Sequence, residues 1–133
     1  MKYLLDTDVI IYWIKGIEAI EEKVMTEGLG NIRFSIVSKA ELWFGAYNSI
    51  HIEKNMKNIE KLCTLISVLP FCDLAAEKFG KIKAGLKKSG KLIADADIMV
   101  ASISLANNMI LITNNERHFQ RIPDLKIENW MKK

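Results

Sequence analysis

Residues 2–11 read KYLLDTDVII. A short apolar run stops at Asp6-Thr7-Asp8, and apolar residues then return at helical spacing. The pattern predicts a buried strand over Lys2–Leu5 and a helix over Asp8–Lys15, with Asp8 as its N-cap. Ligands of open α/β sheets lie outside the carboxyl ends of the strands, so Asp6 is a candidate site residue. The alternative on this stretch alone is that both aspartates serve only the turn and the cap.

The composition indicates one globular domain spanning residues 1–133. Half of the residues are apolar and 26% are charged, which is enough for one continuous core. The net charge of +3 is too small to indicate nucleic-acid binding, so the distribution of charge must decide that question. We expect Cys63 and Cys72 to be core residues in a reducing compartment, because two cysteines do not make a disulfide framework. The N-terminus lacks a signal-peptide pattern and no apolar run reaches membrane-spanning length, so we expect a cytoplasmic protein with no membrane partner.

Strand patterns alternate with helical patterns along the whole chain. Beyond the first pair, we predict strands over Arg33–Val37, Ser67–Phe71, Met109–Thr113 and Leu125–Glu128. We predict helices over Ile17–Thr26, Ser38–Tyr47, Ser49–Ile66, Leu74–Leu86, Ala94–Ala106 and Asn115–Phe119. This alternation is typical of a three-layer α/β/α fold, with a central, mostly parallel sheet of about five strands and right-handed crossovers.

Glu41 is the first candidate partner for Asp6, because it follows a predicted strand near the start of a helix. Its surroundings read SIVSKAELWFG from Ser35 to Gly45. Ser38 and Glu41 also fit a capping box, in which the glutamate only bonds the backbone amide of the serine. Both interpretations of Glu41 stay open at this point.

Two later segments of the chain supply further candidate site residues. Asp95 and Asp97 point about 200° apart on a helix, so one is expected to cap the helix and the other to face the site. Thr113-Asn114-Asn115 follows the strand that begins at Met109, where a turn and an N-cap are the alternative. Carboxylates converging at one edge would repel one another, and a hard divalent cation removes that cost. Oxygen ligands favour Mg²⁺ or Mn²⁺ over zinc. His51 and His118 are isolated in the sequence and are interpreted as surface residues.

With these residues assembled, the chain resembles the PIN-domain ribonucleases, specifically the VapC-type toxins of toxin–antitoxin pairs. The likeness covers nearly the full length and rests on four segments in the family's order and spacing. The segments are DTDVIIYW, FSIVSKAELWFGA, IADADIMVASISLA and LITNNERHFQRIPDLKIENW. The resemblance therefore implies a PIN-like domain.

The resemblance also implies roles for individual residues. Asp6, Glu41 and Asp97 match the acidic metal ligands, and Asn115 matches a fourth catalytic position that is often Asp. Thr7, Thr113 and Asp95 take supporting roles, with Asp95 as a capping acid. This chain departs from the family pattern twice, because Asp8 stands where Asn is usual and His118 stands where a further Asp often occurs.

The implied activity is metal-dependent hydrolysis of RNA phosphodiester bonds, leaving a 5′-phosphate and a 3′-hydroxyl. The implied partners are RNA, a cognate antitoxin and a second copy of the chain. Three alternatives remain: a stand-alone RNA-processing nuclease, an idle interaction module, and a haloacid-dehalogenase-type phosphatase. LLDTDVI matches the opening of that phosphatase, but too few residues follow Thr113 to supply its lysine and its acidic pair.

Six lysines fall within the fourteen residues from Lys78 to Lys91, directly before the Asp95–Asp97 region. They fit a solvated amphipathic helix, and they also fit a rim that contacts RNA phosphates beside the acidic site. The RNA-binding candidates are Lys87, Lys88, Lys91 and Arg117.

Overall fold

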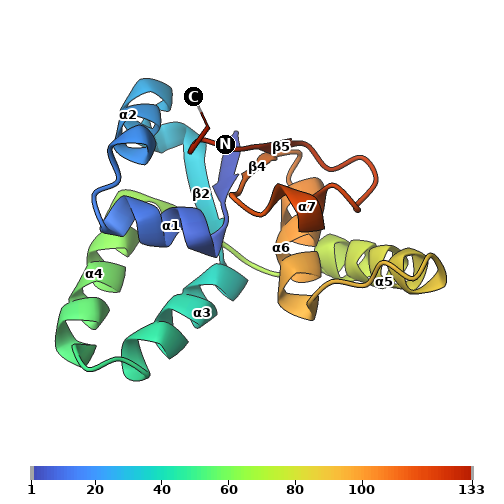
Figure 1. Ribbon diagram of the computed structural model, residues 1–133, viewed down its shortest axis with the longest axis horizontal. Coiled ribbons are helices and arrows are strands. Elements are labelled where there is room, and N and C mark those ends of the chain that lie inside the picture. The colour runs from blue at the N-terminus through green and yellow to red at the C-terminus, as the bar shows by residue number, and fades with distance from the viewer. Residues whose placement is uncertain (1, 133) are drawn as a thin grey trace.

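The computed structural model describes residues 2–132, and its centre is a five-stranded sheet with the order β3-β2-β1-β4-β5 (Figure 1). All four strand pairings are parallel. The strands are β1 (Tyr3–Leu5), β2 (Ile32–Ser35), β3 (Ser67–Leu69), β4 (Ile110–Ile112) and β5 (Ile127–Glu128). The predicted α/β/α class and all five predicted strands are confirmed, each strand being shorter than its sequence pattern.

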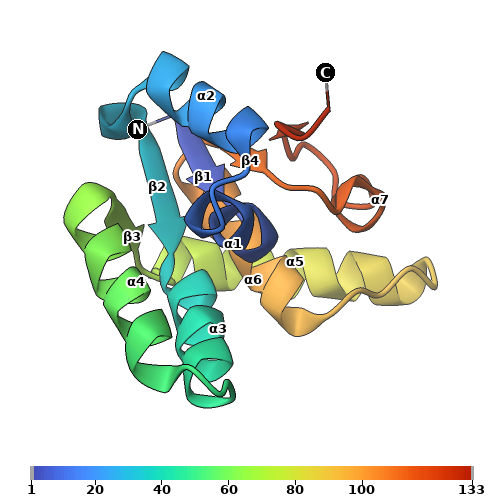
Figure 2. The ribbon, with the colours of Figure 1, turned by 60° about the vertical axis from the view of Figure 1, so that its left-hand side comes forward.

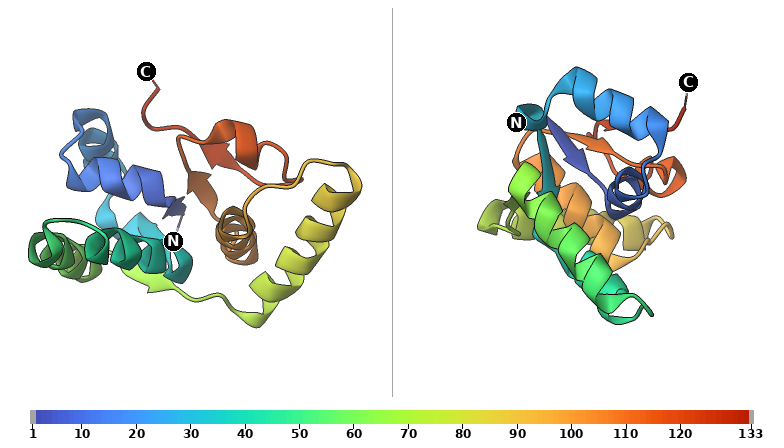
Figure 3. Two further views of the ribbon diagram at one scale, coloured as in Figure 1. Left: turned by 60° about the horizontal axis from the view of Figure 1, so that its bottom comes forward. Right: turned by 90° about the vertical axis from the view of Figure 1, so that its left-hand side faces the viewer.

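Helices cover both faces of this sheet, as the turned views show (Figures 2 and 3). They are α1 (Thr7–Ile14), α2 (Glu18–Glu27), α3 (Ile36–Tyr47), α4 (Ile52–Leu65), α5 (Asp73–Lys88), α6 (Asp95–Ala106) and α7 (Glu116–Phe119). A single 3₁₀ turn, η1 (Leu29–Asn31), was not predicted. No helix within residues 2–132 is both long and apolar enough to cross a membrane.

Side chains of β1 point alternately to the two faces of the sheet, and the core therefore consists of two clusters. Tyr3 and Leu5 belong to one buried cluster with residues of α1 to α4, whereas Leu4 belongs to a second with residues of α5, α6 and α7. Successive strand side chains point to opposite faces, so a strand buried on both faces reads as a continuous apolar run. Cys63 packs against the first cluster and Cys72 against the second, and neither forms a disulfide.

The strand order places the site. From β1 the chain builds β2 and β3 on one side, and then crosses to build β4 on the other side of β1. Leu5 pairs with Phe34 of β2 and with Ile112 of β4, so these three strands end at the same level. Asp6 follows β1 at the point where the strand order reverses, which is where open α/β sheets bind ligands.

Three predicted helix caps are wrong. Asp6, not Asp8, caps α1, because its extended backbone leaves its carboxylate accepting from the Thr7 amide at 2.9 Å. Ser35 caps α3 by accepting from the Ser38 amide at 3.0 Å, so the Ser38–Glu41 capping box does not form. Ala94 occupies the cap position of α6 without a side-chain bond, and Asp95 instead pairs with Lys83 of α5 at 2.9 Å.

Candidate active site

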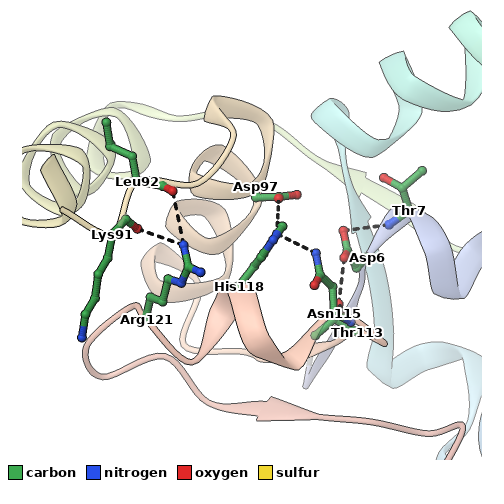
Figure 4. A network of polar contacts seen from close by, with 9 residues as sticks. All are labelled: Asp6, Thr7, Lys91, Leu92, Asp97, Thr113, Asn115, His118 and Arg121. Atoms are coloured by element: carbon green, nitrogen blue, oxygen red, sulfur yellow. Dashed lines mark hydrogen bonds and ion pairs between the residues drawn. The ribbon is translucent and has the colours of Figure 1, made fainter.

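Asp6 is held between the ends of two strands. Its amide donates to the carbonyl oxygen of Ile112 at 2.9 Å, which fixes the backbone against β4. Its carboxylate Oδ1 accepts from the Thr7 amide, and Oδ2 accepts from the Thr113 hydroxyl at 2.9 Å (Figure 4). Only 7% of the residue is exposed. The Asp6 carboxylate is therefore buried and held at the edge of the sheet where the parallel strands end.

Burial makes the charge on this carboxylate costly. It raises the pKa of Asp6 from 3.8 to about 7, and the nearby charge of Asp8 adds to the rise. Burial also raises the pKa of Asp8, although its carboxylate accepts from the amides of Val9 at 2.7 Å and Asn114 at 3.2 Å. Ionising both carboxyl groups together is therefore unfavourable, and a bound cation would remove that cost.

Asp97 reaches the same edge from the first turn of α6. Its charge raises the pKa of both Asp6 and Asp8. Its Oδ2 lies 3.4 Å from Nδ1 of His118, and the Asn115 side-chain amide lies 2.8 Å from that same nitrogen (Figure 4). The Asn115 backbone amide donates to the Thr113 hydroxyl at 2.9 Å, so one chain of contacts runs from Asp6 to His118. The expectation that His118 is an isolated surface residue is wrong.

Glu41 approaches from the opposite side, on α3. It lies in the second turn of the helix and is exposed. The Thr7 hydroxyl donates to Glu41 Oε1 at 2.6 Å and lies 2.9 Å from the hydroxyl of buried Ser38. Thr7 thus links Glu41 to its neighbour Asp6. Sequence reasoning missed Ser38 as a site residue, because the predicted capping box had given it another role.

The three predicted metal ligands surround one site without closing on it. Within residues 2–132, no three Asp, Glu, His or Cys side chains lie close enough together to hold a metal ion directly. The donor set still fits a hard cation, because the carboxylates of Asp6, Asp97 and Glu41 supply oxygen ligands only. Mg²⁺ usually keeps several of its waters and needs few protein ligands, so direct contact with all three carboxylates is not required.

The remaining predicted site residues lie beside this cluster. Asp95 is exposed and faces Lys83, away from the contacts of Asp97. Lys87 and Lys88 are exposed at the end of α5, and Lys91 and Arg117 are exposed on the segments around Asp97. Within residues 2–132, none of these four cations forms an ion pair with the carboxylates of Asp6, Asp97 or Glu41.

The fold and site define a PIN domain, and the PIN domain family model matches residues 3–125. The chain belongs to this family. Among curated relatives, it is 37% identical to ribonuclease VapC2 of Haemophilus influenzae, over 98% of this chain and 99% of that protein. It is 33% identical to the tRNA(fMet)-specific endonuclease VapC of Shigella flexneri, over 98% of each chain. The crystal structure of the DNA-bound VapBC complex from Salmonella typhimurium contains a chain that is 32% identical, with a TM-score of 0.93 over 98% of each chain. Within the PIN family, the relatives therefore place this chain with the VapC ribonucleases.

Proposed function

We propose that this chain is a divalent-metal-dependent endoribonuclease, the toxin of a toxin–antitoxin pair, which hydrolyses RNA phosphodiester bonds in the cytoplasm. One observation carries the proposal: a buried carboxyl group with a raised pKa, Asp6, lies beside Asp97 and Glu41 at the sheet edge. A fold gains nothing from gathering such groups at one edge, so their cost indicates a cation site. The ribonuclease names of the relatives supply the substrate class.

Each polar residue has a distinct task in this proposal. Asp6, Asp97 and Glu41 would hold a Mg²⁺ or Mn²⁺ ion, since all three supply carboxylate oxygens. The bound cation supplies an activated water and stabilises the charge that grows on the phosphoryl oxygens. Thr113 fixes the orientation of the Asp6 carboxylate, and Thr7 holds that of Glu41.

Asn115 acts through His118. Its side-chain nitrogen lies 2.8 Å from Nδ1 of the ring, the same atom that faces Asp97 Oδ2 at 3.4 Å. This contact keeps the His118 ring beside Asp97. Asn115 is therefore a positioning residue, although the family pattern makes it a catalytic one.

The test is cleavage of single-stranded RNA with Mg²⁺, with Mn²⁺ and with a chelator. We expect Asp6→Asn to abolish cleavage and Asp95→Asn to retain it, because Asp95 contacts Lys83 and not the cluster. These variants are matched, since each removes one carboxylate charge within the same acidic region. Equal loss of activity in both would exclude the proposed division of roles.

We also propose an antitoxin partner and a homodimer. A cavity of about 540 Å³ between α1, α3 and α4 is lined by apolar side chains, including Ile11, Ile14 and Leu42, and by polar ones, including Glu41, Lys15 and Lys54. Such a groove fits the apolar face of an amphipathic helix from an antitoxin.

The homodimer rests on a different surface. Phe44 and Tyr47 are 70% and 62% exposed at the end of α3, which is more apolar surface than a monomer needs. Monomeric behaviour at micromolar concentration in sedimentation would contradict the dimer, and failure of the co-expressed antitoxin to co-purify would contradict the groove.

A further inference from the structure

A second cavity lies on the other side of the molecule, between α5 and the segment that follows α7. Its volume is about 350 Å³, within the range of small-ligand sites. One face of α5 supplies Ile82, Gly85, Leu86 and Ser89, and Leu105 of α6 completes an apolar floor. None of Asp6, Glu41 and Asp97 lines this cavity, so it is separate from the proposed metal site.

The rim of this cavity is cationic. Lys78, Lys81 and Arg121 line it, together with one acid, Asp124. In the part of the chain from residue 2 to residue 132, none of these three cations forms an ion pair within 4.0 Å. The Arg121 side chain donates only through Nη1, to the carbonyl oxygens of Lys91 at 3.4 Å and Leu92 at 3.3 Å. No hydrogen bond within residues 2–132 uses its other guanidinium N–H groups, which leaves them available to an anion.

The cavity is joined to the acidic edge through α7. The Arg121 amide donates to the carbonyl oxygen of His118 at 3.2 Å, one turn away. His118 in turn contacts Asp97, and the Lys91–Leu92 segment held by Arg121 leads directly into α6 (Figure 4). A strand of RNA leaving the metal site along α7 would therefore reach Arg121 next.

We propose that this cavity binds one nucleotide of the RNA substrate, away from the scissile bond. The inference rests on the proposed ribonuclease function and adds a substrate-binding site to it. A nucleotide combines an apolar base with an anionic phosphate, which matches an apolar floor under a cationic rim. Arginine planes stack on unpaired bases, and Lys78 and Lys81 contact the neighbouring phosphates. A protein partner would instead need a larger, more apolar surface than this cavity offers.

Gly85 permits a test that leaves the fold intact. A Cβ built at Gly85, which lines the cavity, meets no atom within 4 Å, so Gly85→Leu places a larger side chain at the cavity from a position with open space around its first carbon. Gly80 lies in the same helix, is equally free of neighbours and does not line the cavity, so Gly80→Leu is the matched control. Both changes favour the helix to a similar degree, because each replaces glycine by a strong helix former.

The experiment measures the affinity of each variant, in an Asp6→Asn background, for a short fluorescent single-stranded RNA of mixed sequence. We expect Gly85→Leu to weaken binding about tenfold, the scale of losing one nucleotide's contacts, and Gly80→Leu to change it little. A second arm titrates adenosine 5′-monophosphate by NMR, where shifts of the Gly85 and Ser89 amides are expected in the parent protein and not in Gly85→Leu.

The outcomes separate this inference from the proposed function. RNA binding that Gly85→Leu does not weaken overturns the cavity as a substrate site and leaves the ribonuclease standing. Adenosine 5′-monophosphate binding there, with RNA affinity unchanged, assigns the cavity to a free nucleotide and overturns the RNA assignment. A changed oligomeric state in Gly85→Leu alone makes the cavity a protein interface and overturns it too. Absence of RNA binding by the parent protein contradicts both proposals.

Discussion

The buried carboxyl group of Asp6 should make the metal-free protein less stable as pH rises. Its pKa is raised from 3.8 to about 7, first by burial and then by the charge of Asp8. Between these two values the folded chain binds a proton that the unfolded chain has released. The stabilisation is therefore complete below about pH 4 and is lost as pH rises through about 7.

The size of the effect follows from the same two values. A difference between 3.8 and about 7 corresponds to on the order of 4 kcal/mol in the free energy of unfolding. Solvent screens the group little, because Asp6 is only 7% exposed. Against a typical total of about 5–15 kcal/mol, an effect of this size changes the denaturation midpoint visibly.

The assay is urea unfolding with a chelator present, from about pH 4 to about pH 8, followed by the fluorescence of the three tryptophans. Asp6→Asn keeps a neutral side chain of the same shape at every pH. Wild type and Asp6→Asn should be close in stability at the acid end, and the variant should be the more stable at the alkaline end. Asp95→Asn controls for the loss of a carboxylate elsewhere and should follow the wild-type curve.

A stability difference between wild type and Asp6→Asn that does not grow with pH would contradict the raised pKa of Asp6. Mg²⁺ gives an independent check, because the cation binds the ionised carboxylate. Saturating Mg²⁺ at the alkaline end should stabilise wild type and leave Asp6→Asn almost unchanged.

Three further predictions concern neighbouring residues. Asp97→Asn should abolish RNA cleavage and slightly stabilise the metal-free protein, since it removes a charge that disfavours ionised Asp6; full activity in a gel assay would remove Asp97 from the site. Thr7→Val should lower kcat about tenfold, the scale of losing one charge-assisted hydrogen bond, while Thr7→Ser keeps the bond to Glu41; equal rates for the two variants would count against the link. Replacing Lys87, Lys88 and Lys91 together by Gln should weaken RNA binding and leave the melting temperature unchanged. The slope of log affinity against log salt concentration should flatten by up to about two units, and an unchanged slope would mean that these lysines do not contact RNA phosphates.

The sheet could be predicted because its signals are local. Each strand is a short apolar run that stops at a polar residue, and alternation with helices implies parallel pairing. Asp6 and Thr113 follow from this pattern, since parallel strands bring their carboxyl ends to one edge, whereas Asp97 was placed by the predicted helix that begins at Ala94. The structure confirms that these three residues come together there.

The start of α3 could not be predicted, because strand pairing decides it. The sequence pattern extends the second strand to Val37, whereas its pairing with β3 stops at Ser35. That difference moves the helix cap from Ser38 to Ser35 and places Glu41 one turn deeper in α3. Glu41 therefore does not form the capping box with Ser38, and its carboxylate accepts a hydrogen bond from the Thr7 hydroxyl.

Side-chain contacts between segments that are distant in the sequence could not be predicted either. His118 joins Asp97 from 21 residues away, and Lys83 pairs with Asp95 across two helices. Neither contact has a local signal, since each depends on how α6 packs against its neighbours. The only hint for His118 was its place where the family often has a further acid.

The chemistry of the RNA ends gives the most direct test of the account. Wild-type protein would be incubated with single-stranded RNA and Mg²⁺ or Mn²⁺, and the product ends would be identified by mass spectrometry. Hydrolysis by a cation-activated water predicts 5′-phosphate and 3′-hydroxyl ends, no products in the presence of a chelator, and none from folded Asp6→Asn protein. A 2′,3′-cyclic phosphate, formed equally well with chelator or by Asp6→Asn, would contradict the assignment of this acidic edge as a metal-dependent nuclease site.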